Sequence, residues 1–491
     1  MRRRIGSKEI SPVELLDTCI ARIERINPAV NAVTAVCYER ARAEAKAAEK
    51  AALQGEALGL LHGLPTGIKD LDETGGLLTT YGSPLYRDFI PEHDNAMVAR
   101  VRAAGAIVVG KTNVPEFGAG ANSRNFVWGA TGNPFNPTLN AGGSSGGSAV
   151  ALATSMLPVC TGSDTGGSLR IPAAICGVVG FRPSPGLVPV ERRGLGWTPI
   201  SVVGPMGRTV ADTCLLLGAQ AAMDDCDPLS YPIDGRSFAI PALCDLGSLR
   251  VAYTEDFGIS PVDAPIRKLF RDKVQAMRHL FRSCDEVTFD LFAQADDCFD
   301  VIRAQNYAAR YRSAYEQDPA SLGPNVRANY EIAARMSLAD VASAHTEQTN
   351  IFRRFQKMFR DYDLVLAPTT PVSPFPWTQL YLAEMDGKPL RNYYHWLSLT
   401  YVITLATNPA ISIPCGVDHA GMPFGLQVVG GFRQDHALLS AAHAMEQAFE
   451  AIPALRRPIP DLGKLAQPTP ELKSIVTHPP KPGTAMAASP T

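Results

Sequence analysis

Residues 125–163 form a stretch of 39 residues that contains no Asp, Glu, Lys or Arg. A membrane-spanning helix needs about 20 consecutive apolar residues. The apolar part of this stretch, residues 149–160, is shorter than that and includes a Thr, a Ser and a Pro. A second uncharged stretch, residues 396–417, is interrupted by Asn408 and Pro409. The sequence therefore predicts no transmembrane helix.

Glycine is concentrated around the same stretch, with 15 of the 41 Gly residues between Gly110 and Gly186. Two Gly/Ser clusters stand out, NAGGSSGGS at residues 140–148 and GSDTGGSLR at residues 162–170. A flexible linker is one interpretation. Each cluster, however, runs directly into an apolar segment, which favours loops between elements of one sheet. A phosphate-binding P-loop would need a Lys after the last Gly, where this chain has Ser148.

Composition excludes several classes of protein. The chain has 491 residues, 46% hydrophobic and 19% charged, which is typical of a folded protein rather than a disordered one. Its 46 basic and 48 acidic residues give no reason to expect a nucleic-acid-binding or polybasic membrane-surface protein. The ten cysteines are dispersed without a CxxC pair, which predicts reduced thiols in a cytoplasmic protein.

Helix and strand patterns alternate along the chain. Ser11, Pro12 and Glu14 are typical of a helix start, with a cap, a first-turn Pro and a capping-box acid. Further helices are expected at residues 41–53, 95–104, 148–156, 261–284, 291–315, 338–359 and 436–449. Short apolar strands are expected at residues 106–109, 157–161, 178–181, 249–253, 364–367, 410–414 and 424–429. The mixture predicts an α/β fold with a large mixed β-sheet flanked by helices on both faces.

No clear linker divides the first 450 residues, so we expect one domain over residues 1–455. Its catalytic core would lie at about residues 60–215, and residues 225–360 would form a helical elaboration. Residues 456–491 are rich in Pro and small residues, which predicts a tail whose order decreases towards its end.

Two alternative sites are weak. Residues 143–147 fit G-x-S-x-G, the nucleophile elbow of α/β-hydrolases, with Ser145 as the nucleophile of an esterase. That elbow needs a preceding buried strand and a suitably placed His, and neither is evident. Asp70 and Asp72 begin like a calcium loop, but the twelfth position is Tyr81 rather than Glu. We therefore interpret Asp70, Asp72 and Glu73 as surface carboxylates at a turn. No metal site is predicted.

Acyl transfer at neutral pH offers an interpretation that uses more of these features. It needs a nucleophile, a base and donors aimed at the developing oxyanion. Thr165, Gly166, Gly167 and Ser168 supply successive backbone N–H groups that can converge on an anion, with the Ser168 hydroxyl beside them. No His is tied to this region, but a Lys can serve as the base where burial lowers its pKa. The uncharged stretch provides such surroundings.

Four segments resemble the amidase signature family: GIKD at residues 67–70, GKTNVPEF at 110–117, GGSSGG at 142–147 and DTGGSLRIP at 164–172. Their order and spacing match the family, including the 24 residues from Ser144 to Ser168. The likeness extends from about residue 8 to residue 449. Members of the family usually carry further residues before the stretch matching 5–11, so this chain would begin inside the first helix.

The resemblance implies a Ser–cis-Ser–Lys triad and no cofactor. Ser168 falls on the nucleophile, Ser144 on the serine that precedes a cis peptide bond, and Lys69 on the base. The backbone amides of residues 165–168 would bind the oxyanion. Supporting roles would fall to Ser145, through a hydrogen bond, and to Asp164 and Arg170, through an ion pair near the loop.

The substrate is less constrained by the resemblance. We expect a small-molecule amide, hydrophobic or aromatic, hydrolysed to an acid and an amine or ammonia, with no nucleic acid or membrane as partner and homodimerisation left open. The candidate pocket residues are Phe117, Gly118, Phe126, Trp128, Trp377 and Trp396. One alternative is the amidase subunit of a glutamyl-tRNA amidotransferase, which would need a partner, ATP and charged tRNA. A non-catalytic binding protein on the same scaffold is disfavoured because all three triad residues are present.

Overall fold

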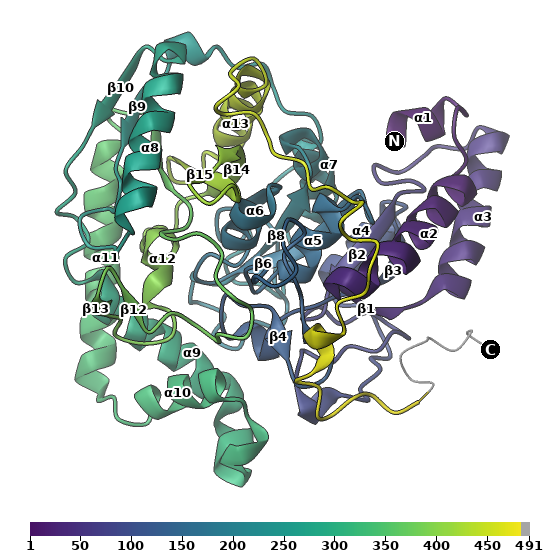
Figure 1. The fold of residues 1–491 in the computed structure, drawn as a ribbon, viewed down its shortest axis with the longest axis horizontal. Helices are drawn as coiled ribbons and strands as arrows, with labels where there is room; N and C mark the ends of the chain where they lie inside the picture. Colours follow the sequence, from purple (N-terminus) through teal and green to yellow (C-terminus); the bar gives the residue numbers. More distant parts are fainter. Residues whose placement is uncertain (483–491) are drawn as a thin grey trace.

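The computed structural model describes residues 1–482 and contains a sheet of 11 strands (Figure 1). Their spatial order is β1-β3-β2-β6-β8-β7-β14-β15-β11-β9-β10. The strands of this sheet are β1 (Val33–Val36), β2 (Pro65–Lys69), β3 (Ile107–Thr112), β6 (Val159–Asp164), β7 (Val179–Arg182), β8 (Val202–Gly207), β9 (Arg250–Tyr253), β10 (Ser283–Glu286), β11 (Leu364–Pro368), β14 (Ala410–Val417) and β15 (Pro423–Gly430). Two further pairs are short: β4 (Arg124–Asn125) with β5 (Gly129–Ala130), and β12 (Glu384–Met385) with β13 (Lys388–Pro389).

The strand directions make this a mixed sheet. Parallel pairing joins β2 to β3 and to β6 near one end of the sheet, and joins β9 to β10 and to β11 at the other. Between them, β6, β8, β7, β14, β15 and β11 pair antiparallel in succession. The expected α/β class with a large mixed sheet is confirmed.

Helices cover both faces of the sheet. They are α1 (Arg2–Gly6), α2 (Pro12–Val30), α3 (Tyr38–Gln54), α4 (Ala96–Ala103), α5 (Gly146–Ala153), α6 (Arg170–Cys176), α7 (Val210–Gln220), α8 (Ala264–Met277), α9 (Ala295–Gln317), α10 (Pro324–Ala333), α11 (Leu338–Met358), α12 (Ser398–Leu405) and α13 (Asp435–Phe449). On β15, a Cβ at Gly425 would meet Ala174 of α6, whereas one at Gly430 would meet Leu438 of α13. Successive residues of a strand face opposite sides of the sheet. Gly425 and Gly430 are five residues apart, so α6 and α13 lie on opposite faces of the sheet.

The uncharged stretch lies in the middle of the molecule. It ends in α5 and β6, and every residue of α5 is buried. Helix α5 packs on β2, β6 and β8, and it needs Gly147 because a Cβ there would lie 2.2 Å from the Asn113 backbone nitrogen. The stretch is therefore core rather than linker. Within residues 1–482, no helix has the length and apolar character that crossing a membrane requires.

Several elements of the structure were not predicted, among them β1, β2 and β8 of the main sheet and helix α10. Ser11 does accept hydrogen bonds from the amides of Val13 and Glu14 and completes the predicted capping box. The predicted helix over residues 261–284 ends earlier, at Met277, and β10 follows as an edge strand. The region expected to be a helical elaboration therefore also contributes β9 and β10 to the main sheet.

The C-terminal segment follows the body of the protein as far as it is described. Beyond α13 it crosses to the N-terminal half, where the amide of Thr469 donates to the carbonyl of Pro28 at 3.1 Å (Figure 1, yellow). Leu465 and Leu472 are buried, so this part of the predicted tail packs on the body of the protein. The last part of the predicted tail, residues 483–491, lies outside the described residues.

Replacing Leu472 with Ala tests whether this segment stabilises the fold. Leu472 is fully buried and packs with Ala130 and Trp377. Removing its side chain leaves a cavity, so we expect the free energy of unfolding to fall by about 2–5 kcal/mol in urea titrations. The matched control is Ile459→Ala in the same segment, because Ile459 is 81% exposed and should change stability by less than about 0.5 kcal/mol. Equal, small effects in both variants would contradict the packing.

Candidate active site

Lys69 ends β2 with its side chain fully buried. Its Nζ lies 2.8 Å from Ser144 Oγ, 2.7 Å from Ser145 Oγ and 2.9 Å from Ser163 Oγ. No carboxylate of the described residues lies within ion-pair distance of this nitrogen. The structure thus brings Lys69, Ser144 and Ser145 together as predicted and adds Ser163, which the sequence did not indicate.

Burial decides the protonation of Lys69. Desolvation lowers the pKa of Lys69 to about 7, although the carboxylates of Asp72 and Asp164 favour its charged form. At that pKa a large fraction of Lys69 is a neutral amine near pH 7. A neutral amine beside a serine hydroxyl can accept its proton, which is what a general base requires.

The peptide bond between Gly143 and Ser144 is cis. The sequence comparison with the family placed Ser144 before such a bond, whereas in the structure Ser144 follows it. Gly118 lies against this serine, because a Cβ at Gly118 would be 3.3 Å from Ser144 Oγ. Ser144 itself is buried but borders the cavity described below.

The carboxylates near Lys69 are buried, so their assignment to a surface turn was wrong. Asp70 is fully buried and Asp72 is 6% exposed. Burial raises the pKa of Asp70 to about 6, opposed by Lys111 and by hydrogen bonds from Thr80. Burial likewise raises the pKa of Asp72 and lowers the pKa of Lys111, although the two attract each other. Lys111 Nζ also donates to the backbone carbonyl of Asp72. Asp70, Asp72 and Lys111 thus form a buried cluster of ionisable groups near Lys69.

Asp164 organises the second Gly/Ser loop. It accepts hydrogen bonds from the Gly167 amide at 2.9 Å, from Arg170 Nη2 at 2.9 Å and from Arg182 Nη1 at 3.1 Å. All three charged side chains are fully buried. Burial alone would raise the pKa of Asp164, but the two guanidinium groups hold it well below its usual range. The predicted Asp164–Arg170 pair is present, and Arg182 is an additional member that the sequence did not indicate.

Arg170 ties this loop to the C-terminal half of the sheet. Its Nη1 donates to the Gln427 side chain at 2.7 Å and to the Thr400 carbonyl at 2.9 Å. Gly167 has a φ of +122°, and a Cβ there would lie 2.2 Å from Thr400 Oγ1. A side chain at this position would clash as well as strain the backbone. The loop can therefore take this shape only with Gly at position 167.

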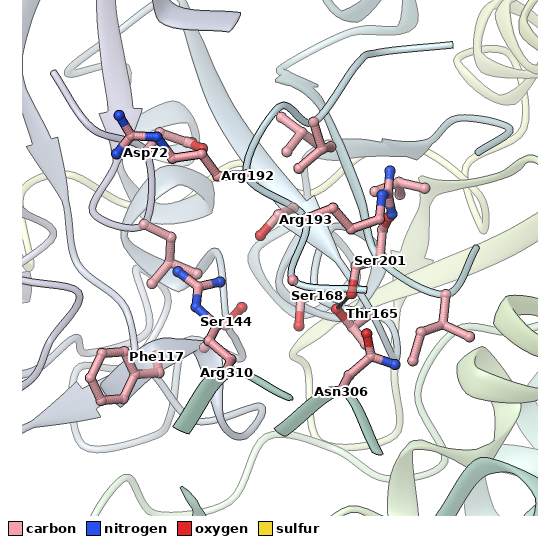
Figure 2. Close-up of a pocket in the computed structure, with 18 of the residues that line it drawn as sticks. Asp72, Phe117, Ser144, Thr165, Ser168, Arg192, Arg193, Ser201, Asn306 and Arg310 are labelled. Carbon is pink, nitrogen blue, oxygen red and sulfur yellow. Dashed lines mark hydrogen bonds between the residues drawn. The ribbon is translucent and has the colours of Figure 1, made fainter. Parts of the chain in front are cut away.

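Ser168 is half-buried at the edge of a cavity of about 230 Å³ that also reaches Ser144, Thr165 and Gly166 (Figure 2). Its Oγ makes no hydrogen bond with any of residues 1–482, and the amides of Thr165, Gly166 and Ser168 have no acceptor within the same range. The Gly167 amide, which was predicted to bind the oxyanion, instead donates a hydrogen bond to Asp164. Three of the four predicted amides remain available to a ligand.

The aromatic residues predicted for the pocket mostly lie elsewhere. Phe117 and Gly118 line the cavity. Phe126 instead borders a separate shallow groove, and Trp128 packs on the core while its Nε1 donates to Thr80 Oγ1. Trp377 and Trp396 are buried at 5% and 3% exposure without reaching the cavity. The aromatic lining comes instead from residues on other segments: Tyr81, Tyr307 and Tyr311.

Ser145 is not exposed to the cavity. It is fully buried, its Oγ faces Lys69, and its amide donates to the Ser168 carbonyl at 3.3 Å. No His is among the residues that line the cavity. An esterase mechanism with Ser145 as nucleophile and His as base therefore lacks both access to the cavity and the His.

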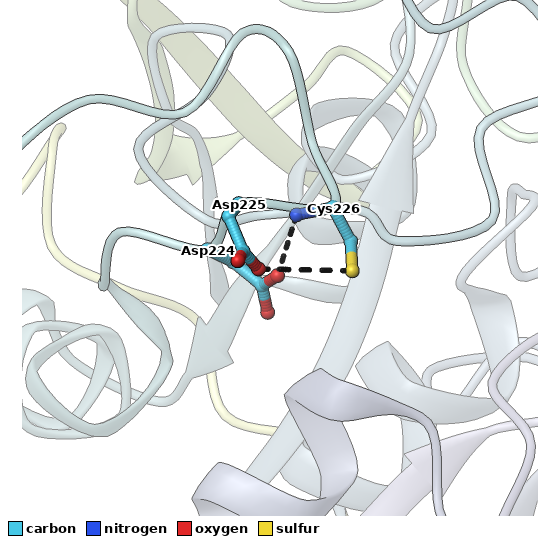
Figure 3. A group of neighbouring side chains, drawn as sticks. All are labelled: Asp224, Asp225 and Cys226. Carbon is cyan, nitrogen blue, oxygen red and sulfur yellow. Dashed lines mark hydrogen bonds between the residues drawn. The ribbon is translucent and has the colours of Figure 1, made fainter.

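A group of three possible metal ligands lies outside this site, at Asp224, Asp225 and Cys226 (Figure 3). Asp224 already forms an ion pair with Arg100 at 3.1 Å and accepts a hydrogen bond from the Cys226 amide at 3.0 Å. Asp225 and Cys226 are exposed. Acidic groups at an exposed turn commonly have this arrangement, and we assign no metal role to it.

The family model described as Amidase matches residues 14–439 of this chain. The chain belongs to the amidase family. An acylamidase of Rhodococcus erythropolis is 33% identical over 453 residues, which cover 91% of this chain and 94% of that protein. One subunit of the glutamyl-tRNA(Gln) amidotransferase of Acaryochloris marina is 34% identical over 477 residues, covering 92% and 97%. The expected resemblance to the amidase signature family is confirmed.

Solved structures agree with this assignment. A bacterial aryl acylamidase of the amidase signature family superposes with a TM-score of 0.83 at 26% identity, covering 96% of both chains. A 6-aminohexanoate cyclic dimer hydrolase complexed with substrate has a TM-score of 0.80 at 28% identity, covering 93% of this chain and 98% of the other. This amidase is therefore a hydrolase that acts on amide C–N bonds.

Replacing Asp164 with Asn tests the buried ion cluster. The substitution leaves Arg170 and Arg182 buried without their carboxylate, and two guanidinium nitrogens of Arg182 already have no partner among residues 1–482. We expect a loss of about 3–5 kcal/mol in the free energy of unfolding, measured by urea titration. The control is Glu9→Gln, which removes the exposed Arg4–Glu9 pair and should leave the free energy of unfolding nearly unchanged. A similar small loss in both variants would contradict the role of Asp164.

Proposed function

We propose that this amidase hydrolyses carboxylic amides through an acyl-enzyme on Ser168, with Ser144 as the proton carrier and Lys69 as the base. The observation that carries the proposal is the contact between a buried lysine nitrogen and Ser144 Oγ at 2.8 Å, beside the cavity that Ser144 shares with Ser168. A desolvated lysine can be neutral at pH 7 and accept a proton there. Ser168 Oγ has no hydrogen-bond partner among the described residues, and the proposal requires it to hydrogen-bond to Ser144 Oγ when a substrate is bound.

In the proposed acylation, Lys69 takes the hydroxyl proton of Ser144 while Ser144 takes that of Ser168. Ser168 Oγ then bonds to the substrate carbonyl carbon and forms a tetrahedral oxyanion. When the intermediate collapses, the C–N bond breaks and the leaving nitrogen receives a proton from Ser144, which Lys69 replenishes. The products of this step are a free amine or ammonia and an ester to Ser168.

Deacylation reverses the relay with water in place of the amine. Water gives a proton to Ser144 and through it to Lys69, and the resulting hydroxide bonds to the ester carbonyl. Collapse releases the carboxylic acid and returns a proton to Ser168. In both steps the amides of Thr165, Gly166 and Ser168 would donate hydrogen bonds to the oxyanion and stabilise it. These three amides donate to no acceptor among the described residues.

The cavity supports a substrate with an aromatic or hydrophobic part. Phe117, Tyr81, Tyr307 and Tyr311 contribute rings to its wall, and Phe117 packs 4.6 Å from Tyr311 between ring centroids. The similarity to a bacterial aryl acylamidase supports the same class. A domain over residues 1–455 acting without a cofactor is part of the proposal.

A role as the amidase subunit of a glutamyl-tRNA amidotransferase is the second candidate. It is favoured by relatives of that name that are 34% identical over nearly the whole chain. Such a subunit would feed ammonia to a partner protein. Efficient hydrolysis of aryl amides by the purified chain alone would favour the stand-alone enzyme, whereas activity that depends on added partner subunits would favour this second candidate.

Replacing Ser168 with Ala tests the nucleophile. Without Oγ no acyl-enzyme forms, so we expect kcat/KM for aliphatic amides, anilides and small esters to fall at least about a thousand-fold. The control is Ser474→Ala, at an exposed serine far along the C-terminal segment. Peptide mapping after labelling with a fluorophosphonate gives a second measurement, with the label expected on Ser168. A label on Ser145, or full activity in Ser168→Ala, would overturn the mechanism.

The pH dependence tests the base. Because the neutral form of Lys69 accepts the proton, kcat/KM should rise as pH increases through about 7 and then level off. Below that pH the ammonium form dominates and cannot accept a proton, so activity is lost on the acidic side. Lys69→Ala should lose most of its activity and no longer show this acidic limb. A residual profile with the wild-type limb would mean that another group titrates.

A further inference from the structure

Helix α9 forms one wall of the cavity. Five of its residues line the space: Arg303, Asn306, Tyr307, Arg310 and Tyr311. Their spacing of three and four residues places them on one face of the helix. In Figure 2, Asn306 and Arg310 extend from this helix into the cavity that Ser144 and Ser168 border. The wall is therefore within reach of a substrate bound at Ser168.

The four arginines of the cavity differ in their partners. Arg192 forms ion pairs with Glu73 and, at 3.8 Å, with Glu191. Arg193 forms an ion pair with Asp227 at 3.2 Å. By contrast, Arg303 and Arg310, the two arginines of α9 that line the cavity, have no carboxylate within 4.0 Å anywhere in residues 1–482.

Arg303 is held in place by neutral groups. It is 5% exposed, and its Nε donates to Asn329 Oδ1 at 3.0 Å while its Nη2 donates to Tyr393 Oη at 2.7 Å. Its guanidinium also lies 5.0 Å from the Tyr307 ring centroid. The remaining terminal nitrogen, Nη1, has no acceptor among the described residues and keeps some solvent contact at the cavity. The side chain is thus fixed, with one donor group left over.

Arg310 completes the pair two turns along the helix. It is an exposed side chain, and its guanidinium lies 5.7 Å from the Tyr311 ring centroid without a hydrogen bond to any of residues 1–482. The acidic residues that line the cavity interact with groups outside α9. Glu73 binds Arg192 and accepts a hydrogen bond from Tyr81, and Asp72 lies beside Lys111. No acidic residue that lines the cavity forms an ion pair with Arg303 or Arg310.

Arg303 is a nearly buried guanidinium without a counterion, which is unfavourable unless an anion binds close to it. Arg310 is the neighbouring guanidinium on the cavity wall that is exposed to a ligand. Arginine suits a carboxylate best, because its planar donors match the two oxygens. We propose that the amide substrate carries a carboxylate that binds Arg310, with support from Arg303, while its scissile carbonyl lies at Ser168. The proposal rests on the function proposed above and narrows its substrate class to amides of small dicarboxylic acids or other carboxylate-bearing amides.

A matched pair of anilides tests this selectivity. Glutaryl 4-nitroanilide carries the carboxylate, and 5-methylhexanoyl 4-nitroanilide replaces it with an isopropyl group. We expect the wild type to prefer the glutaryl compound. Arg310→Gln should lower the ratio of the two kcat/KM values at least about tenfold, because it removes a charged hydrogen bond to the carboxylate. Arg310→Lys should retain part of the preference.

The control is Arg312→Gln, on the same helix but paired with Glu316 and absent from the cavity wall, which should leave the ratio unchanged. A wild-type preference for the isopropyl compound, or an unchanged ratio in Arg310→Gln, would overturn the proposal.

Calorimetric binding of glutaryl 4-nitroanilide to Ser168→Ala, compared with Ser168→Ala/Arg310→Gln, separates this proposal from the catalytic one because it needs no turnover. At least about tenfold weaker binding in the double variant supports the anion site even if Ser168 is not the nucleophile. Equal binding in the two proteins contradicts the anion site, whichever residue performs the chemistry.

Discussion

Lys69 is fully buried, and its Nζ contacts three serine hydroxyls but no carboxylate within residues 1–482. A charged ammonium in that position would lose its hydration without gaining an ion pair, so the neutral amine is favoured. The surrounding chain fits this condition, because the uncharged residues 125–163 provide α5 and most of β6 around it. An additional acid in contact with Nζ would raise the pKa of Lys69 and favour the form that cannot accept a proton.

A second buried charge cluster meets a different requirement. Asp164 carries its charge at the end of β6 and is compensated by Arg170 and Arg182, so it remains ionised and fixes the loop that presents Ser168. One site therefore contains a basic group whose pKa is lowered by burial and an acidic group that pairing keeps charged. The two are close enough for Asp164 to oppose the lowering of the Lys69 pKa, yet burial remains the larger effect.

The fold class could be predicted from the alternation of helix and strand patterns, and the proposed triad rests on three short motifs. Lys69, Ser144 and Ser168 each lie within a short segment whose order and spacing are readable. The pocket could not be read in the same way. Trp128 and Trp396 look like pocket residues by type, but whether a ring faces the cavity or the core depends on packing between distant segments. Arg182 was missed for the same reason, because β7 reaches Asp164 only through the sheet.

The charges that line the cavity say more about the substrate than the net charge of the chain does. A formal net charge of −2 predicts nothing about the substrate, because paired charges cancel wherever they lie. The cavity is different, since the ion pairs of Arg192 and Arg193 account for two of its four arginines and leave those of α9 without a carboxylate among the described residues. Arg303 and Arg310 are seven residues apart in α9, a spacing that lies on one face of a helix. Their lack of acidic partners became visible only when the structure showed what surrounds that face.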